Sequence, residues 1–165
     1  LADRLVAPHR NTLPVSGTRE ALFLLALLTV PETRAGGRPV VLVPNPYYAT
    51  YSGAAVMSGA EPVFMPSPRE AGFLPDLDTL DEATLARTAL MYLCSPSNPQ
   101  GAAASRAYLE RAIGLARRHG FVLAVDECYS EIYTGEPPAG ALEACGDALD
   151  NLIDDVEGNQ DHSRG

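Results

Sequence analysis

Short runs of apolar residues alternate along the chain with longer segments that have a helical pattern. Four of the runs have few polar positions and are rich in β-branched or large side chains, which is typical of parallel strands buried on both faces. We expect strands over residues 40–43, 62–65, 89–93 and 121–125, and residues 151–153 begin like one more strand. Because helical segments lie between the strands, the pattern predicts an α/β domain with three layers and a mostly parallel sheet.

Two of the helical segments have recognisable ends. Residues 19–28 are apolar on nearly every side, so we expect a helix that is buried within a larger domain, with Ser16 or Thr18 as its cap. A second helix follows Ser105 and ends at Gly120. Its inward stripe should consist of Leu109, Ala112, Ile113 and Ala116. Shorter helices are expected over residues 53–59 and 77–86.

Composition limits the classes of protein to which the chain can belong. The 165 residues are 46% apolar, which is enough for one domain with a real core. A net charge of −9 argues against a nucleic-acid partner, since phosphate binding needs a basic patch. The longest apolar run, residues 21–30, is too short to span a bilayer, so we expect no membrane partner. The first residue is Leu1, so we expect that the start is missing.

The three cysteines bear on the compartment and on metal binding. Cys94, Cys128 and Cys145 are odd in number and widely spaced, and they form neither a CxxC pair nor a Cys/His metal spacing. We therefore expect reduced thiols in a cytoplasmic protein, and no metal site.

Asp126 directly follows the apolar run 121–125, at the carboxyl end of a predicted strand. Open α/β sheets bind ligands at this edge. A carboxylate that is partly buried there stays ionised if a cation or a hydrogen-bond donor faces it. Tyr129 can offer a hydroxyl from the same rim, and the pair suits a protonated heteroaromatic ring. Taken alone, Asp126 is better explained as a turn or helix-cap residue after a strand, and Tyr129 as an aromatic residue on the rim.

Three further places carry candidate binding residues. Gly17 and Thr18 begin a helix, where free N–H groups beside a small hydroxyl form an anion site. The three tyrosines within residues 47–51 follow a strand and can stack a ring on a flat ligand. Asn98 precedes a proline, which holds its backbone extended and its amide in a fixed direction. Each place has an ordinary alternative. Gly17 and Thr18 can simply begin a capped helix, the tyrosines can pack their rings on the sheet, and Asn98 can be a turn residue.

These four motifs occur in an order that resembles the large domain of the fold-type I, pyridoxal-phosphate-dependent aminotransferases. The motifs are the Ser-Gly-Thr helix start, the tyrosines after a strand, Ser-Asn-Pro-Gln-Gly at residues 97–101 and Asp-Glu-Cys-Tyr at residues 126–129. The resemblance covers residues 12–153. The phrases at residues 13–23 and 126–133 are more similar still to the N-succinyldiaminopimelate aminotransferases of bacterial lysine synthesis. The resemblance to the aminotransferase family implies amino-acid and 2-oxo-acid substrates and a homodimer.

The resemblance also implies roles for seven residues, four of which precede the middle of the chain. Gly17, Thr18 and the backbone of Arg19 would hold the phosphate of pyridoxal 5′-phosphate. Tyr48 would stack on the pyridine ring of the cofactor.

The other three residues would bind the polar atoms of the ring. Asn98 and Tyr129 would hydrogen-bond its phenolic oxygen. Asp126 would pair with the ring nitrogen and keep it protonated, which makes the ring an electron sink.

The chain departs from the family pattern after residue 153. All 12 basic residues are arginine, so no residue can serve as the Schiff-base lysine, and we assign no catalytic residue. We expect residues 1–153 to be a partial pyridoxal-phosphate-binding large domain and residues 154–165 to be a disordered tail unrelated to the family. The small C-terminal domain should be absent. A truncated or frame-shifted gene would explain this pattern.

Two functions therefore remain open from the sequence. The chain is a fragment of an aminotransferase, or it is a catalytically inactive module that binds the cofactor or a partner. A nucleotide-binding α/β domain is less favoured, because the chain has neither GxGxxG after its first strand nor a P-loop lysine. Because the helix over residues 19–28 is apolar all round, we also expect a poorly soluble or marginally folded chain.

Overall fold

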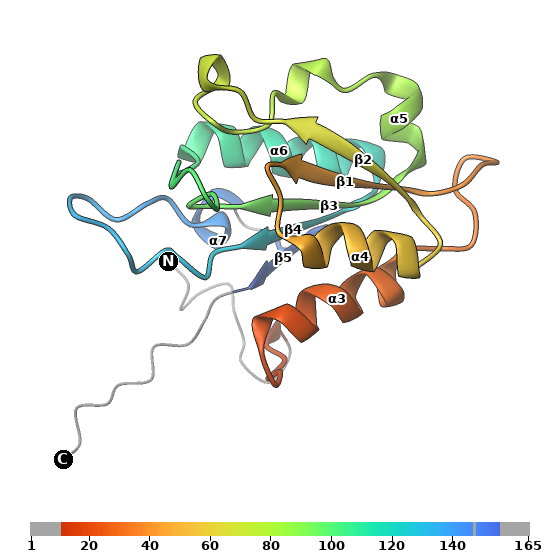
Figure 1. Cartoon of the computed structure of the whole chain (residues 1–165), viewed down its shortest axis with the longest axis horizontal. Helices are drawn as coiled ribbons and strands as arrows, with labels where there is room; N and C mark the ends of the chain where they lie inside the picture. The colour runs from red at the N-terminus through yellow and green to blue at the C-terminus, as the bar shows by residue number, and fades with distance from the viewer. Residues whose placement is uncertain (1–10, 147, 156–165) are drawn as a thin grey trace.

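A computed structural model of the chain describes residues 11–146 and 148–155. Five strands form one sheet in the order β2-β1-β3-β4-β5, and each pair of neighbours is parallel (Figure 1). The strands are β1 (Val40–Asn45), β2 (Glu61–Pro66), β3 (Thr88–Cys94), β4 (Val122–Asp126) and β5 (Leu152–Asp155). The predicted α/β fold with a parallel sheet is confirmed, including the fifth strand.

All five strands extend beyond their predicted carboxyl ends, β1 and β5 by two residues and the other three by one. Pro44 lies within β1 instead of ending it, and pairs in register with Met65. A proline lacks one N–H group but keeps an extended backbone, so one ladder bond is lost and the strand continues. β5 includes Asp154 and Asp155, and so extends two residues into the segment that we expected to be a tail. The remainder of that segment, residues 156–165, lies outside the described residues.

The sheet lies between two layers of helices (Figure 1). Successive side chains of a strand point to opposite faces. Val41 and Val43 pack with α3 and α4, whereas Val40 and Leu42 belong to the cluster that contains α6 and α7. The helices of the two layers are α3 (Thr18–Thr29) and α4 (Ala49–Met57) on one face, and α6 (Arg106–His119) and α7 (Ala141–Ala144) on the other.

Helix α6 forms as the sequence predicts. The Ser105 hydroxyl caps it by accepting a hydrogen bond from the Tyr108 N–H at 3.2 Å. Gly120 ends it in the left-handed region at φ 67°, which a glycine adopts without strain. The four predicted inward residues, Leu109, Ala112, Ile113 and Ala116, are all buried.

The two shorter helices differ from their predicted extents. Helix α4 begins at Ala49, four residues before the predicted start. The helix expected over residues 77–86 is divided into a short 3-10 turn, η2 (Leu77–Thr79), and α5 (Glu82–Arg87). The division occurs at Asp81, whose carboxylate accepts a hydrogen bond from the Thr84 N–H at 2.8 Å. An aspartate bonded in this way starts a new helix rather than continuing the previous one. A further 3-10 turn, η1, spans Arg69–Ala71.

Helix α3 is covered on one side only by the described residues. Leu22 and Ala26 are its buried residues, whereas Leu24 is 52% exposed and Leu28 is 82% exposed. The predicted side-chain cap is wrong, because Gly17 occupies the cap position and no side chain bonds there. None of the described helices is both long and apolar enough to cross a lipid bilayer.

Candidate functional site

A cavity of about 270 Å³ lies at the carboxyl edge of the sheet. The chain passes from β1 to β2 on one side, while β3 lies on the other side of β1, so the strand order changes direction there. A crevice opens at such a point beyond the carboxyl ends of parallel strands. Six of the seven predicted site residues line the cavity: Thr18, Arg19, Tyr48, Asn98, Asp126 and Tyr129. Gly17, the seventh, is the cap residue directly before Thr18.

Asp126 ends β4 and is only 5% exposed. Its Oδ2 accepts a hydrogen bond from the Tyr51 hydroxyl at 2.5 Å, and its Oδ1 accepts one from the Cys128 N–H at 3.3 Å. The sequence predicts a donor opposite this carboxylate, but for the tyrosines of residues 47–51 it predicts rings that stack on a ligand or pack on the sheet. No local signal identifies Tyr51 as the donor, since it lies 75 residues from Asp126 along the chain.

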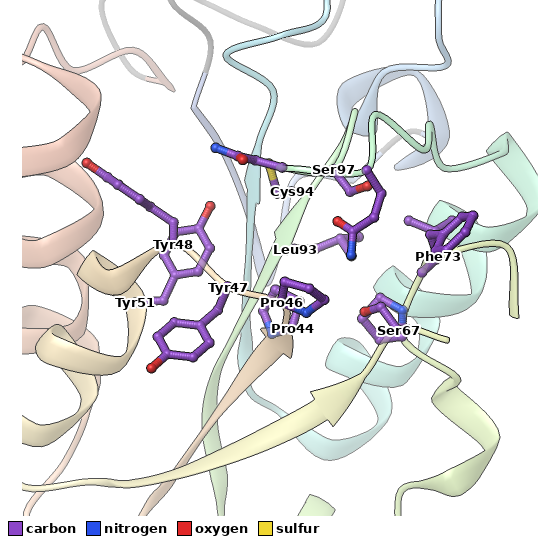
Figure 2. Close-up of a pocket in the computed structure, with 14 residues that line it drawn as sticks. Pro44, Pro46, Tyr47, Tyr48, Tyr51, Ser67, Phe73, Leu93, Cys94 and Ser97 are labelled. Atoms are coloured by element: carbon purple, nitrogen blue, oxygen red, sulfur yellow. The ribbon is translucent and has the colours of Figure 1, made fainter. Parts of the chain in front are cut away.

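The tyrosines of residues 47–51 have three different environments (Figure 2). Tyr47 is partly exposed and packs against Phe64, with ring centroids 5.0 Å apart. Tyr48 is the cap residue of α4, and its hydroxyl accepts a hydrogen bond from Arg19 Nε at 2.6 Å. Tyr51 is buried and meets the Tyr48 ring edge-on, at 5.7 Å and 87°. Tyr48 therefore borders the cavity and is only partly buried, whereas Tyr51 borders it from the core.

Asn98 and Tyr129 come from the loops after β3 and β4 and contact each other. The Asn98 side-chain amide donates a hydrogen bond to the Tyr129 hydroxyl at 3.0 Å. Partial burial is the main cause that raises the pKa of Tyr129, so its hydroxyl stays protonated at neutral pH. The two side chains together place an amide and a phenol on the wall of the cavity.

The start of α3 supplies a place where a negative charge is stabilised. No side chain at the cap residue, Gly17, bonds to the first N–H groups of α3. A helix start favours an anion through such N–H groups and through its dipole. A side-chain carbon at Gly17 would lie 2.8 Å from Glu20 Oε2, so the Glu20 carboxylate folds back against this glycine. The structure therefore has a carboxylate at the helix start, close to the side chains of Thr18 and Arg19 that line the cavity.

Two thiols that the sequence does not identify as site residues also line the cavity. Cys94 and Cys128 are both free. Burial, with a smaller contribution from the Asp126 charge, raises the pKa of Cys94 to about 11. Burial also raises the pKa of Cys128 to about 12. Both thiols are therefore protonated and uncharged at neutral pH.

A second hollow adjoins the cavity (Figure 2). It is lined by residues that follow β1, β2 and β3, among them Pro46, Ser67 and Ser97, and by Phe73. Tyr48 and Tyr51 belong to the walls of both spaces. The hollow measures about 20 Å³, enough for roughly one water molecule. The larger cavity is therefore the candidate binding site.

Comparison with known proteins assigns a family to this arrangement. The sequence model of the family "Aminotransferase class I and II" matches residues 3–159. The LL-diaminopimelate aminotransferase of Desulforudis audaxviator is 34% identical over 140 residues, which are 84% of this chain and 34% of that protein. The chain thus spans about a third of the length of the curated relatives that it matches.

Two solved structures have the same fold. An aminotransferase from Neisseria meningitidis superposes with a TM-score of 0.86 at 34% identity, covering 94% of this chain and 41% of that one. A probable N-succinyldiaminopimelate aminotransferase from Thermus thermophilus gives a TM-score of 0.76 at 32% identity, covering 90% and 38%. The chain therefore belongs to the class I and II aminotransferases, a fold-type I family.

Proposed function

We propose that the cavity binds pyridoxal 5′-phosphate and that the chain is part of the large domain of an aminotransferase. Such an enzyme transfers an amino group between an amino acid and a 2-oxo acid. The observation that carries the proposal is the meeting of a helix start, an aromatic ring, an amide–phenol pair and a buried carboxylate around one cavity. Its volume of about 270 Å³ is just below the ~300–1,000 Å³ of pockets for drug-sized ligands, which suits a small cofactor.

The chemistry of the lining residues fits the two charged ends of this cofactor. Gly17, Thr18 and the backbone of Arg19 would hold the phosphate at the start of α3, where the Glu20 carboxylate now lies. Asp126 would bind the ring N–H, since a buried carboxylate is a strong acceptor for a cationic donor. When bound, the protonated ring supplies the electron sink of the family's chemistry.

The remaining three residues would fix the plane of the ring. Tyr48 would lie against its face, and the Arg19 Nε bond to the Tyr48 hydroxyl would hold the tyrosine in place. Asn98 and Tyr129 would donate hydrogen bonds to the ring's phenolic oxygen.

The substrate that we propose is a diaminopimelate-type amino acid, as in lysine biosynthesis. Support comes from relatives named LL-diaminopimelate aminotransferase and from the similarity to the probable N-succinyldiaminopimelate aminotransferase of Thermus thermophilus. The phrases at residues 13–23 and 126–133 support the same class. A cytoplasmic homodimer is part of this proposal.

A second function is a protein that binds the cofactor without transferring an amino group. One observation favours it: the 165 residues include no lysine, the side chain whose amine would bond with the cofactor's aldehyde. The two functions share the cavity and differ only in the chemistry that follows binding.

Titration of the chain with pyridoxal 5′-phosphate, followed by absorbance, tests the shared part. Asp126→Asn should weaken binding about 10- to 150-fold, because a charge-assisted hydrogen bond contributes roughly 1.5–3 kcal/mol. Asp78→Asn is the matched control, since Asp78 is exposed and pairs with Arg111 away from the cavity. Equal affinities of both variants and the unmutated chain, or no binding at all, would refute the proposed site.

Two measurements separate the two functions. The first is amino-group transfer from LL-diaminopimelate to a 2-oxo acid. The second is mass spectrometry of the chain after incubation with the cofactor and borohydride treatment, which detects a stable adduct. Measurable transfer by this chain alone supports the enzyme. Binding without transfer, and without a stable adduct on a cavity residue, supports the second function.

A further inference from the structure

Two stacked phenol rings lie under the cavity and connect three elements of the fold. Tyr51 of α4 stacks on Tyr92 of β3, with centroids 4.6 Å apart and planes 11° apart. Both side chains are buried, at 1% and 0% exposure. The Tyr92 hydroxyl donates a hydrogen bond to the Leu22 carbonyl of α3 at 2.6 Å, which fixes the lower ring. The Tyr48 ring meets Tyr51 edge-on, so the Tyr51 ring is held between two neighbours.

The fixed Tyr51 ring aims its hydroxyl at one oxygen of Asp126. That hydroxyl donates to Oδ2 at 2.5 Å, whereas Oδ1 accepts a long bond of 3.3 Å from the Cys128 N–H. Each carboxylate oxygen can accept two hydrogen bonds, so Oδ1 keeps acceptor capacity where Asp126 lines the cavity. Burial, and secondarily the charge of Asp126, raise the pKa of Tyr51 far above its ordinary value, so the hydroxyl stays protonated and remains a donor.

Three titratable groups of the described residues near this pair are uncharged at neutral pH. Cys94 approaches from the end of β3 and Cys128 from the loop after β4, and burial keeps both thiols protonated at neutral pH. Burial also raises the pKa of Tyr92, behind Tyr51, above its ordinary value. Neutral hydroxyl and thiol groups are therefore among the neighbours of the Asp126 carboxylate, with Tyr51 as a short-range donor.

We propose that Tyr51 is a positioning residue that holds the Asp126 carboxylate in one orientation, with Oδ1 presented to the N–H of a ring in the cavity. The inference rests on the proposed function, since it concerns the same cofactor. Without the hydroxyl, Oδ2 of the buried carboxylate loses its donor at 2.5 Å, so the carboxylate is no longer held in one orientation. A rotated carboxylate is a poorer acceptor for a ring N–H in the cavity.

The test compares two ligands and two variants. The ligands are pyridoxal 5′-phosphate and its 1-deaza analogue, in which the ring nitrogen is replaced by carbon. The variants, Tyr51→Phe and Tyr92→Phe, each lose one buried hydroxyl and keep their stacked ring. Tyr51→Phe should reduce the preference for the cofactor over the analogue by about tenfold, the effect of losing one charge-assisted bond. Tyr92→Phe should keep that preference within about twofold, since its hydroxyl bonds the Leu22 carbonyl instead. An unchanged or increased preference in Tyr51→Phe would overturn the proposal.

A measurement without cofactor keeps this inference separate from the proposed function. The ¹³C chemical shift of the Asp126 carboxyl carbon at pH 7 should change in Tyr51→Phe and stay in place in Tyr92→Phe. In the unmutated chain, the buried Tyr51 hydroxyl proton should exchange slowly and show a cross-peak to Asp126. If neither ligand binds but these signals behave as stated, the cofactor assignment fails while the positioning by Tyr51 stands. If the carboxyl signal is unaffected by Tyr51→Phe, or the hydroxyl exchanges rapidly, the positioning role is refuted whether or not cofactor binds.

Discussion

Glu127 is a buried carboxyl group that should lose a proton as pH rises, and this loss should make the folded chain less stable. The residue is 5% exposed, and its Oε1 accepts a hydrogen bond from the Ala141 N–H at 2.7 Å. Its side chain is also hydrogen-bonded to Asp154 of β5. Burial, the largest cause, raises the pKa of Glu127 above its ordinary value of 4.5, although both hydrogen bonds oppose this.

The sign of the effect follows from the protons held by each state. Between pH 4.5 and the raised pKa, Glu127 is protonated in the folded chain and ionised in the unfolded chain. The folded chain then holds up to one proton more, so the free energy of unfolding falls by up to about 1.4 kcal/mol for each pH unit. The stabilisation is complete below pH 4.5 and is lost as pH rises through the pKa of the folded state.

Glu127→Gln removes the titrating group and keeps an oxygen for the Ala141 N–H. Urea unfolding at half-unit steps from pH 4.5 to pH 8 should give a free energy of the unmutated chain that falls relative to that of Glu127→Gln. Glu143→Gln is the control, because it removes an exposed carboxylate that pairs with Arg106 on the same side of the sheet. Parallel curves for the unmutated chain and Glu127→Gln would refute the reasoning. A difference that Glu143→Gln reproduces would assign the effect to net charge.

Three further predictions concern the helix ends and the exposed face of α3. Glu20→Gln should raise the affinity for pyridoxal 5′-phosphate several-fold in the absorbance titration, because a carboxylate no longer competes for the start of α3; a weaker affinity would contradict this. Ser105→Ala should lower the free energy of unfolding by about 1 kcal/mol in urea, since the Tyr108 N–H loses its cap; an unchanged midpoint would count against it. The unmutated chain should self-associate in sedimentation, and Leu28→Glu should reduce this because Leu28 is 82% exposed; a monomeric unmutated chain would show that the apolar face is harmless.

The elements of the sheet could be predicted because their signals are local. A strand covered by helices on both faces needs apolar residues at every position, and such runs are visible without knowledge of the fold. Asp81 shows where this reasoning fails, because its side-chain bond to the Thr84 N–H divides a segment whose apolar pattern is continuous. Pro44 shows a second limit, since an extended proline is compatible with both a strand and its end.

The candidate site could be predicted in part for a similar reason. Residues at strand ends reach the same edge of a parallel sheet, so Asn98 and Asp126 are expected to meet there whatever their exact partners. The bond between Tyr51 and Asp126 depends on how α4 lies across β3 and β4, which no local pattern encodes. The exposure of Leu28 is likewise a tertiary property, because an apolar helix has the same sequence whether or not a neighbour covers it.

The cavity is assembled from segments that are far apart along the chain, from Thr18 to Tyr129. In the unfolded chain these groups are dispersed, so a ligand that needs them together binds only the folded form. Such a ligand adds about 2.7 kcal/mol to the free energy of unfolding at a concentration of 100 times its Kd. The helix and strand ends that meet at this rim would then melt as one unit, at a temperature set by ligand concentration. Cofactor supply would thereby control how long the chain survives proteolysis, before any question of turnover arises.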